Sequence, residues 1–184
     1  MNTVPRCRGY FLTISTYGTR LHGDIDGTVD PEHRAYGFPL CPPDPAREYF
    51  ERARMVQPAY ILDQARREIV LRSCQNVCQF RRWWLFVAHI RSNHAHLVLQ
   101  AGDEPERVLN YLKSYASRAL TNANLEQKER RRWARHGSTR YLWTDEQLRA
   151  AIRYVLMEQG EPMSLYSAPD LWKITNAEST ETRA

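Results

Sequence analysis

The sequence predicts one α+β domain of ferredoxin-like type, in which an antiparallel sheet carries helices packed on one face. Two observations indicate this fold. Strand-like and helix-like segments follow the order strand, helix, hairpin, helix, strand, helix, and three residues join the two hairpin strands. The chain has 184 residues, 42% of them hydrophobic, which suffices for one compact core. We expect this domain to span residues 1–160, followed by a polar, partly disordered tail over residues 161–184.

The first half of the chain predicts a central strand, a long loop and a long helix. Residues 10–16 are rich in β-branched and aromatic side chains and are followed by Gly18, which is typical of a strand. Residues 21–58 contain several Gly and Asp residues and most of the prolines, so we expect a loop there. Residues 59–80 place apolar side chains at near-helical spacing and predict an amphipathic helix.

The middle of the chain predicts a hairpin and a second helix. Residues 83–90 and 94–100 are strand-like, and the three residues between them are few enough for a tight connection. The acidic, proline-containing segment 103–106 is typical of a helix start, and an apolar stripe continues from it to about Asn122.

A short strand, a third helix and a polar end complete the chain. Residues 139–143 predict the strand, after which Thr144 and Asp145 are suited to cap the helix that carries Tyr154. From about Asn176 onward Ser, Thr and Glu predominate, so we expect this end to be disordered.

The charge of the chain favours nucleic acid as a partner, although weakly. The net charge is +5, and the only lysines among the 26 basic residues are Lys113, Lys128 and Lys173. Arginine binds phosphate with two parallel hydrogen bonds, which suits nucleic acid. A genome rich in G and C would raise the arginine content equally well, so composition alone leaves both explanations open.

The chain lacks the sequence signals of membrane or secreted proteins. It contains no run of about 20 apolar residues, and its first ten residues lack the apolar segment of a secretory signal. We therefore expect a cytosolic protein. The four cysteines form no Cys-x-x-Cys pair, and Cys74 and Cys78 share a helical face, so core packing is the expected role.

The tripeptide His94-Ala95-His96 predicts a metal site. Residues two apart in a strand point to the same face, so both imidazoles are placed to chelate one divalent ion. Tyr154 lies on a later helix, and Glu158 follows it by about one helical turn, where a carboxylate is a suitable further ligand. A metal ion together with a phenol suggests phosphoryl transfer. A tyrosine phenol ordinarily titrates near pH ~10 and becomes a better nucleophile beside a cation.

The segment Asn93-His94-Ala95-His96-Leu97-Val98 resembles the HUH motif of single-tyrosine transposases, especially the REP-associated tyrosine transposases. The segment from Leu112 to Arg118 is similar to the helix that follows the motif in that family, and Trp143 precedes the tyrosine helix as it does there. Tyr154 lies 58 residues after His96, close to the spacing of the family's nucleophile. The resemblance extends from about Arg8 to Gln159.

The resemblance implies a DNA strand transferase that acts in transposition and recombination. Tyr154 is then the catalytic nucleophile, and its attack on a phosphodiester leaves a covalent 5′-phosphotyrosine and a free 3′-hydroxyl. The implied cofactor is Mg²⁺ or Mn²⁺, held by His94 and His96. The implied partner is single-stranded or hairpin DNA, and the implied location is the cytoplasm, in association with the nucleoid.

The third metal ligand is a point where this chain departs from the family. Many relatives have an Asn-Pro pair four and five residues after the tyrosine, whereas this chain has Glu158 and Gln159. Glu158 shares a helical face with Tyr154, and a carboxylate is a better Mg²⁺ ligand than an amide, so we expect Glu158 first and Gln159 second.

Basic and aromatic residues near these motifs are candidates for DNA contacts. They are Arg81, Arg82, Arg91, Lys113, Arg118, Arg130, Arg131, Arg132, Trp133 and Arg135. The run from Arg130 to Arg132 has an alternative interpretation as a solvated connection. Tyr111 and Tyr115 are rivals of Tyr154 for the role of nucleophile, although the helical stripe places Tyr115 toward the core.

Two further hypotheses remain beside the transposase. One is a domesticated protein that binds DNA hairpins and no longer cleaves them. The other is a replication or mobilisation endonuclease of the same superfamily, which the length of the chain disfavours because such enzymes carry additional regions. Nothing in the sequence decides between a monomer and a homodimer.

Overall fold

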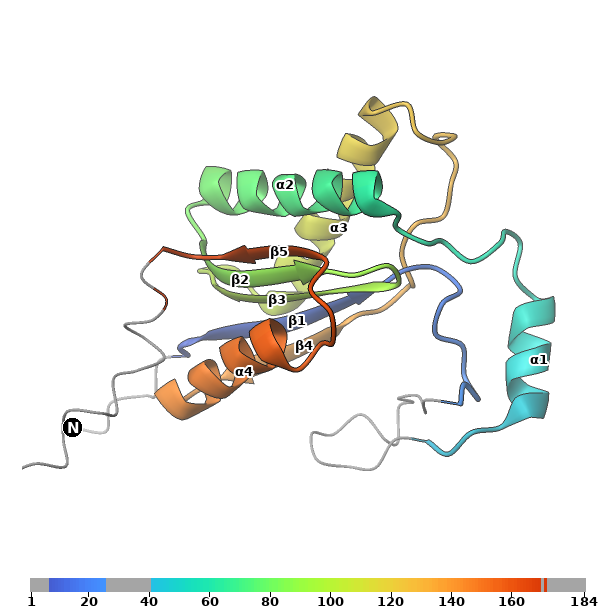
Figure 1. The fold of residues 1–184 in the computed structure, drawn as a ribbon, viewed down its shortest axis with the longest axis horizontal. Helices are drawn as coiled ribbons and strands as arrows, with labels where there is room; N and C mark the ends of the chain where they lie inside the picture. Colours follow the sequence, from blue (N-terminus) through green and yellow to red (C-terminus); the bar gives the residue numbers. More distant parts are fainter. Residues whose placement is uncertain (1–6, 26–40, 170, 172–184) are drawn as a thin grey trace, which may run out of the picture.

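A computed structural model describes residues 7–25, 41–169 and 171 of the chain. The disordered end expected from about Asn176 lies outside these residues. The helices and strands follow the predicted order, with two additions (Figure 1). The elements are β1 (Gly9–Ser15), α1 (Pro45–Ala53), α2 (Gln64–Arg81), β2 (Trp84–Ile90), β3 (His94–Gln100), α3 (Pro105–Asn122), β4 (Ser138–Leu142), α4 (Asp145–Met157) and β5 (Ser164–Ser167).

The strands form one antiparallel sheet in the order β4-β1-β3-β2-β5. The first four strands of this order, together with α2 and α3, make a ferredoxin-like βαββαβ unit. Strand β1 lies inside the sheet, between β4 and β3, as its apolar composition predicts. The predicted α+β class and antiparallel sheet are confirmed.

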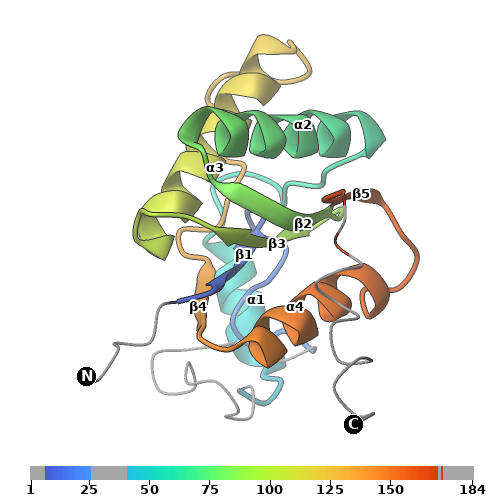
Figure 2. The same cartoon turned by 90° about the vertical axis from the view of Figure 1, so that its left-hand side faces the viewer.

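The helices cover both faces of this sheet. Helices α2 and α3 pack on one face, while α4 lies against the other (Figures 1 and 2). The prediction of helices on one face therefore describes α2 and α3 but not α4. The reason is that the strands are apolar on both sides: Leu97 of β3 packs toward α2 and α3, and its neighbour Val98 packs toward α4.

The segment predicted as a loop over residues 21–58 contains helix α1. Asp44 caps this helix by accepting a hydrogen bond from the Arg47 amide at 3.0 Å, and Pro45 occupies the first turn. None of its residues is buried, so the core provides no apolar pattern from which to predict it.

Helix α2 begins five residues later than expected because the preceding chain pairs with other segments. The amide of Tyr60 donates to the Tyr17 carbonyl at 2.8 Å, and the amide of Leu62 donates to the Ser92 carbonyl at 2.8 Å. Asp63 then caps the helix through the Arg66 amide. Cys74 and Cys78 are free thiols on the buried face of this helix and belong to the core, which confirms their packing role.

Strand β5 lies within the segment predicted as a polar tail. It pairs with β2 through Tyr166 and Leu165, so the sheet extends past residue 160. Leu165 packs beside the α4 side of the core, which explains the apolar residues scattered in this otherwise polar segment. Within the described ranges, no helix combines the length and apolar character needed to cross a membrane.

A buried carboxylate anchors the connection between α3 and β4. Glu126, whose side chain is 8% exposed, pairs with Arg132 and lies 3.3 Å from Arg66 of α2. The hydroxyl of Tyr60 donates to the same carboxylate at 2.5 Å. Burial raises the pKa of Glu126, but the hydrogen bonds from Tyr60 and Arg132 outweigh burial and hold the pKa below its ordinary value.

Replacing Glu126 with glutamine is expected to lower the free energy of unfolding by about 3 kcal/mol, because Arg132 remains buried without its carboxylate. The lowered pKa means that the native protein gains stability from ionised Glu126 above the usual glutamate range and loses it as the pH falls through the lowered value. Thermal unfolding of both proteins at pH 7 and pH 3 measures this effect. The stability difference should shrink at pH 3, and an equal difference at both pH values would contradict the assignment.

Candidate active site

Strand β3 presents His94 and His96 on the face of the sheet that carries α4. Their ring centroids lie 4.6 Å apart with an interplanar angle of 65°. Val98, two residues further along β3, packs against the apolar side chains of α4 on the same face. The two imidazoles lie at the start of β3 and near the C-terminal end of α4, because His94 Nε2 is 3.4 Å from the side-chain oxygen of Gln159 and the His96 ring lies beside that of Tyr154.

His96 is held in a fixed orientation within the sheet. Its side chain is buried, and its Nδ1 lies 3.0 Å from the hydroxyl of Thr13 on the neighbouring strand β1. Burial, followed by the positive charge that His94 can carry, lowers the pKa of His96 to about 3. The ring is therefore neutral at physiological pH, with Nε2 directed away from the threonine.

His94 is oriented by its neighbour in sequence and faces the end of α4. Its Nδ1 lies 2.8 Å from the side-chain oxygen of Asn93, and its Nε2 lies 3.4 Å from the side-chain oxygen of Gln159. Burial lowers the pKa of His94, although the Gln159 oxygen acts in the opposite direction. A neutral ring that donates from Nδ1 to Asn93 leaves a lone pair on Nε2. Two electron-pair donors then face each other, an arrangement that suits a cation between them.

Helix α4 places Tyr154 beside His96. The helix begins at its Thr144 cap and packs on the sheet through Leu148, Ile152 and other apolar residues. The Tyr154 ring centroid lies 5.7 Å from that of His96 and 5.8 Å from that of Phe11. The residue is 37% exposed, so its side chain packs against the site and is also accessible from solvent.

The rival tyrosines do not join this site. Tyr111 and Tyr115 lie on α3, which packs on the other face of the sheet. The guanidinium groups of Arg81 and Arg118 lie over their rings, at 3.7 Å and 4.4 Å from the ring centroids. Tyr154 is thus the tyrosine, of the three considered, that lies beside the two histidines.

The structure brings Gln159, rather than Glu158, to the histidines. Helix α4 ends at Met157, and Glu158 is its exposed C-cap, so the helical spacing that was expected to align Glu158 with Tyr154 does not continue. Among the described residues, no three His, Cys, Asp or Glu side chains are grouped to bind a metal. The prediction of Glu158 as the first choice depends on a helix that continues past Met157 and on the preference of Mg²⁺ for a carboxylate over an amide, and the first of these conditions is not met.

Several residues predicted to contact DNA form hydrogen bonds with other parts of the protein. Buried Lys113 donates to the carbonyls of Ala134 and His136 at 3.0 and 3.2 Å. Arg130 donates to the Pro58 and Ala59 carbonyls, and Arg132 pairs with Glu126. The indole of Trp133 donates to the Lys113 carbonyl and the Ser117 hydroxyl. These four residues hold the connection before β4 in place through bonds to partners distant in the chain.

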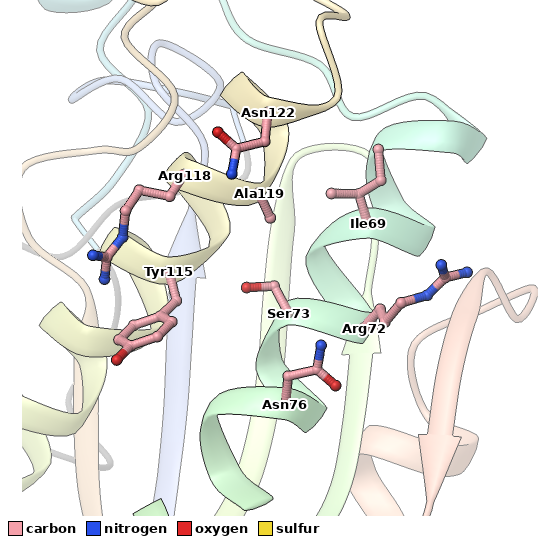
Figure 3. A pocket seen from close by; sticks show the side chains of 8 residues that line it. All are labelled: Ile69, Arg72, Ser73, Asn76, Tyr115, Arg118, Ala119 and Asn122. Carbon is pink, nitrogen blue, oxygen red and sulfur yellow. The ribbon is translucent and has the colours of Figure 1, made fainter. Parts of the chain in front are cut away.

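The remaining candidates lie at different places on the surface. Arg118 lines a groove of about 430 Å³ between α2 and α3, with its guanidinium beside Tyr115 (Figure 3). This groove is on the face of the sheet opposite Tyr154. Arg91 donates from Nη1 to the Glu161 carbonyl at 3.1 Å, and it lies near enough to the histidines for its charge, after the larger effect of burial, to lower the pKa of His94 and His96. The others, Arg81, Arg82, Arg131 and Arg135, lie at the end of α2 and in the connection that leads to β4.

Four residues of the site region were missed by the sequence reasoning: Phe11, Thr13, Arg20 and His89. The rings of Phe11 and His96 lie 5.2 Å apart. Arg20 lies close enough for its charge to lower the pKa of both His94 and His96, after the larger effect of burial. Same-face alternation along β1 and β2 is the signal that identifies the other three, but it requires the strand register to be known.

The fold and the site together describe an α+β protein with two histidines, an amide oxygen and a phenol on one sheet face. No family model matches the chain, and no curated protein matches it. A solved structure of a REP-associated tyrosine transposase bound to a REP hairpin is similar over 86% of this chain and 70% of that chain, with 9% sequence identity and a TM-score of 0.47. A likeness of this size defines neither family nor function, so the functional argument rests on the chain's own residues.

Proposed function

We propose that this protein is a metal-dependent DNA strand transferase that cleaves and rejoins single-stranded or hairpin DNA through Tyr154. The observation that carries the proposal is the convergence of His94, His96 and Tyr154, from two separate elements, on one face of the sheet. The resemblance of the segment around these histidines to the HUH motif supplies the reaction class and its polarity. The chain's excess of arginine agrees with a nucleic-acid substrate.

The residues present suit a divalent cation, Mg²⁺ or Mn²⁺. His94 Nε2 and the Gln159 oxygen face each other, and the neighbouring neutral His96 offers its Nε2. Thr13 and Asn93 occupy the opposite ring nitrogens and thereby orient both imidazoles toward the site. When bound, such a cation neutralises charge on a phosphate and orients it for attack.

Tyr154 performs the covalent step. Its phenolic oxygen attacks phosphorus, the bond between phosphorus and the 3′ oxygen breaks, and a 5′-phosphotyrosine forms. The phenol loses a proton and the departing 3′ oxygen gains one, so no water is consumed and the reverse reaction rejoins strands. Phe11 packs against both Tyr154 and His96, which keeps the nucleophile beside the paired imidazoles.

The substrate strand must expose its phosphate to a half-exposed tyrosine beside a sheet, which favours single-stranded or hairpin DNA. Arg20 and Arg91 bring positive charge to the histidines and are the basic residues best placed to attract the strand. We propose that the protein acts on DNA in the cytoplasm, in association with the nucleoid and as a monomer or homodimer.

The decisive experiment is the capture of a covalent adduct. The protein is incubated with hairpin oligonucleotides labelled at the 3′ end, with Mg²⁺ or Mn²⁺, and resolved on a denaturing gel. The 3′-labelled fragment should migrate with the protein, because the phosphotyrosine carries the 5′ end of that fragment. Binding without any adduct across a library of hairpins and single strands would instead favour the domesticated hairpin binder.

The two candidates for third metal ligand can be separated by a matched pair of substitutions. Gln159→Ala should raise the Mn²⁺ concentration needed for half-maximal adduct formation by about 10-fold, because it removes the oxygen that faces His94. Glu158→Ala should change it by less than about 2-fold, since this side chain is exposed at the end of α4. The reverse order of effects would restore Glu158 as the ligand.

A further inference from the structure

His89 is a buried histidine on β2 that uses both ring nitrogens. It is 1% exposed and lies directly opposite His96 in the strand register. Its Nδ1 lies 3.3 Å from the carbonyl of Val155 on α4, and its Nε2 lies 3.1 Å from the amide nitrogen of Met163. A carbonyl only accepts and an amide only donates, so the ring donates from Nδ1 and accepts at Nε2.

The two partners of His89 bracket the segment that contains Gln159. Val155 follows Tyr154 directly, and Met163 stands just before β5. The Val155 carbonyl belongs to the last turn of α4, where helical carbonyls lose their intrahelical partners, and His89 supplies a substitute donor. The Met163 amide likewise donates to a group inside the protein, the Nε2 of His89.

A second side chain supports the same segment. Arg91, two residues after His89 in sequence, donates to the Glu161 carbonyl at 3.1 Å. Side chains of β2 and the residue following it therefore hold the chain on both sides of Gln159. Between Met157 and Ser164 the chain forms no helix or strand. The amide of Glu158 still donates to the Tyr154 carbonyl at the end of α4, and beyond it the bonds from His89 and Arg91 attach the segment to β2 and the residue that follows it.

We infer that His89 is a positioning residue that fixes the end of the tyrosine helix, and thereby sets Tyr154 and Gln159 against His96 and His94. The inference rests on the proposed function for the roles of Tyr154 and Gln159. The two hydrogen bonds of His89, to the Val155 carbonyl and from the Met163 amide, are called the tether below, and they are independent of that function. Displacement of a nucleophile by about 1 Å can lower a rate by about 100-fold. Loss of the tether therefore affects the chemical step more than it affects DNA binding.

The test compares two substitutions of His89 with a control substitution in the core between the sheet and helices α2 and α3. His89→Leu removes both hydrogen bonds and retains apolar bulk. His89→Asn keeps an N–H donor at the position of Nδ1 and can still reach the Val155 carbonyl. Val77→Ala weakens the core beneath α2, which lies on the opposite face of the sheet, and serves as a destabilised protein with an intact tether.

Five quantities are measured for each variant: amide hydrogen exchange, thermal stability, Mn²⁺ affinity, hairpin affinity by fluorescence anisotropy, and the single-turnover rate of adduct formation. For His89→Leu we expect exchange at Met163 to rise at least 10-fold and adduct formation to fall by about 100-fold, with affinity unchanged within about 2-fold. His89→Asn should recover most of the rate. Val77→Ala should keep both the rate and the slow exchange at Met163.

The outcomes separate the tether from the chemistry. Unchanged exchange at Met163 in folded His89→Leu overturns the inference. So does a rate of adduct formation that falls in proportion to thermal stability in both His89→Leu and Val77→Ala. If the wild-type protein forms no adduct, the proposed function fails. The tether is then judged by the exchange at Met163 and by Mn²⁺ affinity, which should fall in His89→Leu because Gln159 is displaced.

Discussion

Replacing Tyr154 with phenylalanine is expected to abolish the covalent adduct with DNA, lowering its rate of formation by about 10⁴-fold or more. The substitution removes the oxygen that we propose as the nucleophile and leaves the ring that packs against Phe11 and His96. The residue is 37% exposed, so the fold and the hairpin affinity should persist. Adduct formation is measured on denaturing gels with a 3′-labelled hairpin, and affinity by anisotropy.

The matched control for this variant is Tyr115→Phe. Tyr115 lies on α3, on the opposite face of the sheet, beneath the guanidinium of Arg118. The Tyr115→Phe variant should form the adduct at the wild-type rate. An adduct that survives in Tyr154→Phe and disappears in Tyr115→Phe would reassign the nucleophile and with it the location of the active site.

Replacing His96 with alanine is expected to lower metal-dependent adduct formation by about 10³-fold, because several kcal/mol of charge stabilisation depend on a correctly held ion. The hydroxyl of Thr13 orients the His96 ring, and the ring of Tyr154 lies next to it. Mn²⁺ binding, followed by the loss of the free-ion signal in electron paramagnetic resonance, should weaken in parallel. His94→Ala is expected to behave in the same way.

The control for the histidines is His136→Ala, which changes the same residue type at an exposed position before β4. It should bind Mn²⁺ and form the adduct as the wild-type protein does. If His96→Ala keeps its affinity for Mn²⁺ and loses activity, the imidazole acts on the substrate directly, and the metal assignment is wrong.

Local sequence patterns predicted the elements that build the site. Alternation along residues 94–100 predicts a strand with His94 and His96 on one face, and β3 has this arrangement. A capping threonine followed by an apolar stripe predicts the helix of Tyr154, and Thr144 does cap α4. These features depend on residues within about one turn or one strand of each other, so a single chain is enough to predict them.

Other features depend on partners distant in the chain, and local sequence patterns do not predict them. Lys113 and Arg132 have the charge of DNA contacts, yet their donors are used by carbonyls and a carboxylate inside the protein. Glu158 is predicted above Gln159 as a metal ligand from helical spacing and carboxylate chemistry, but α4 ends at Met157 and the oxygen of Gln159 is the one that lies 3.4 Å from His94. Strand β5 forms because β2 offers it an unpaired edge, which the polar composition of the segment conceals.

The sequence by itself determined the α+β class, the order of most elements, and the presence of two histidines on one strand face, because periodicity and capping are short-range effects. The tertiary structure alone decided that α4 covers the second face of the sheet, that Gln159 faces His94, and that His89 holds the tyrosine helix in place. Strand register and the packing of separate elements determine these contacts, and both depend on the whole chain.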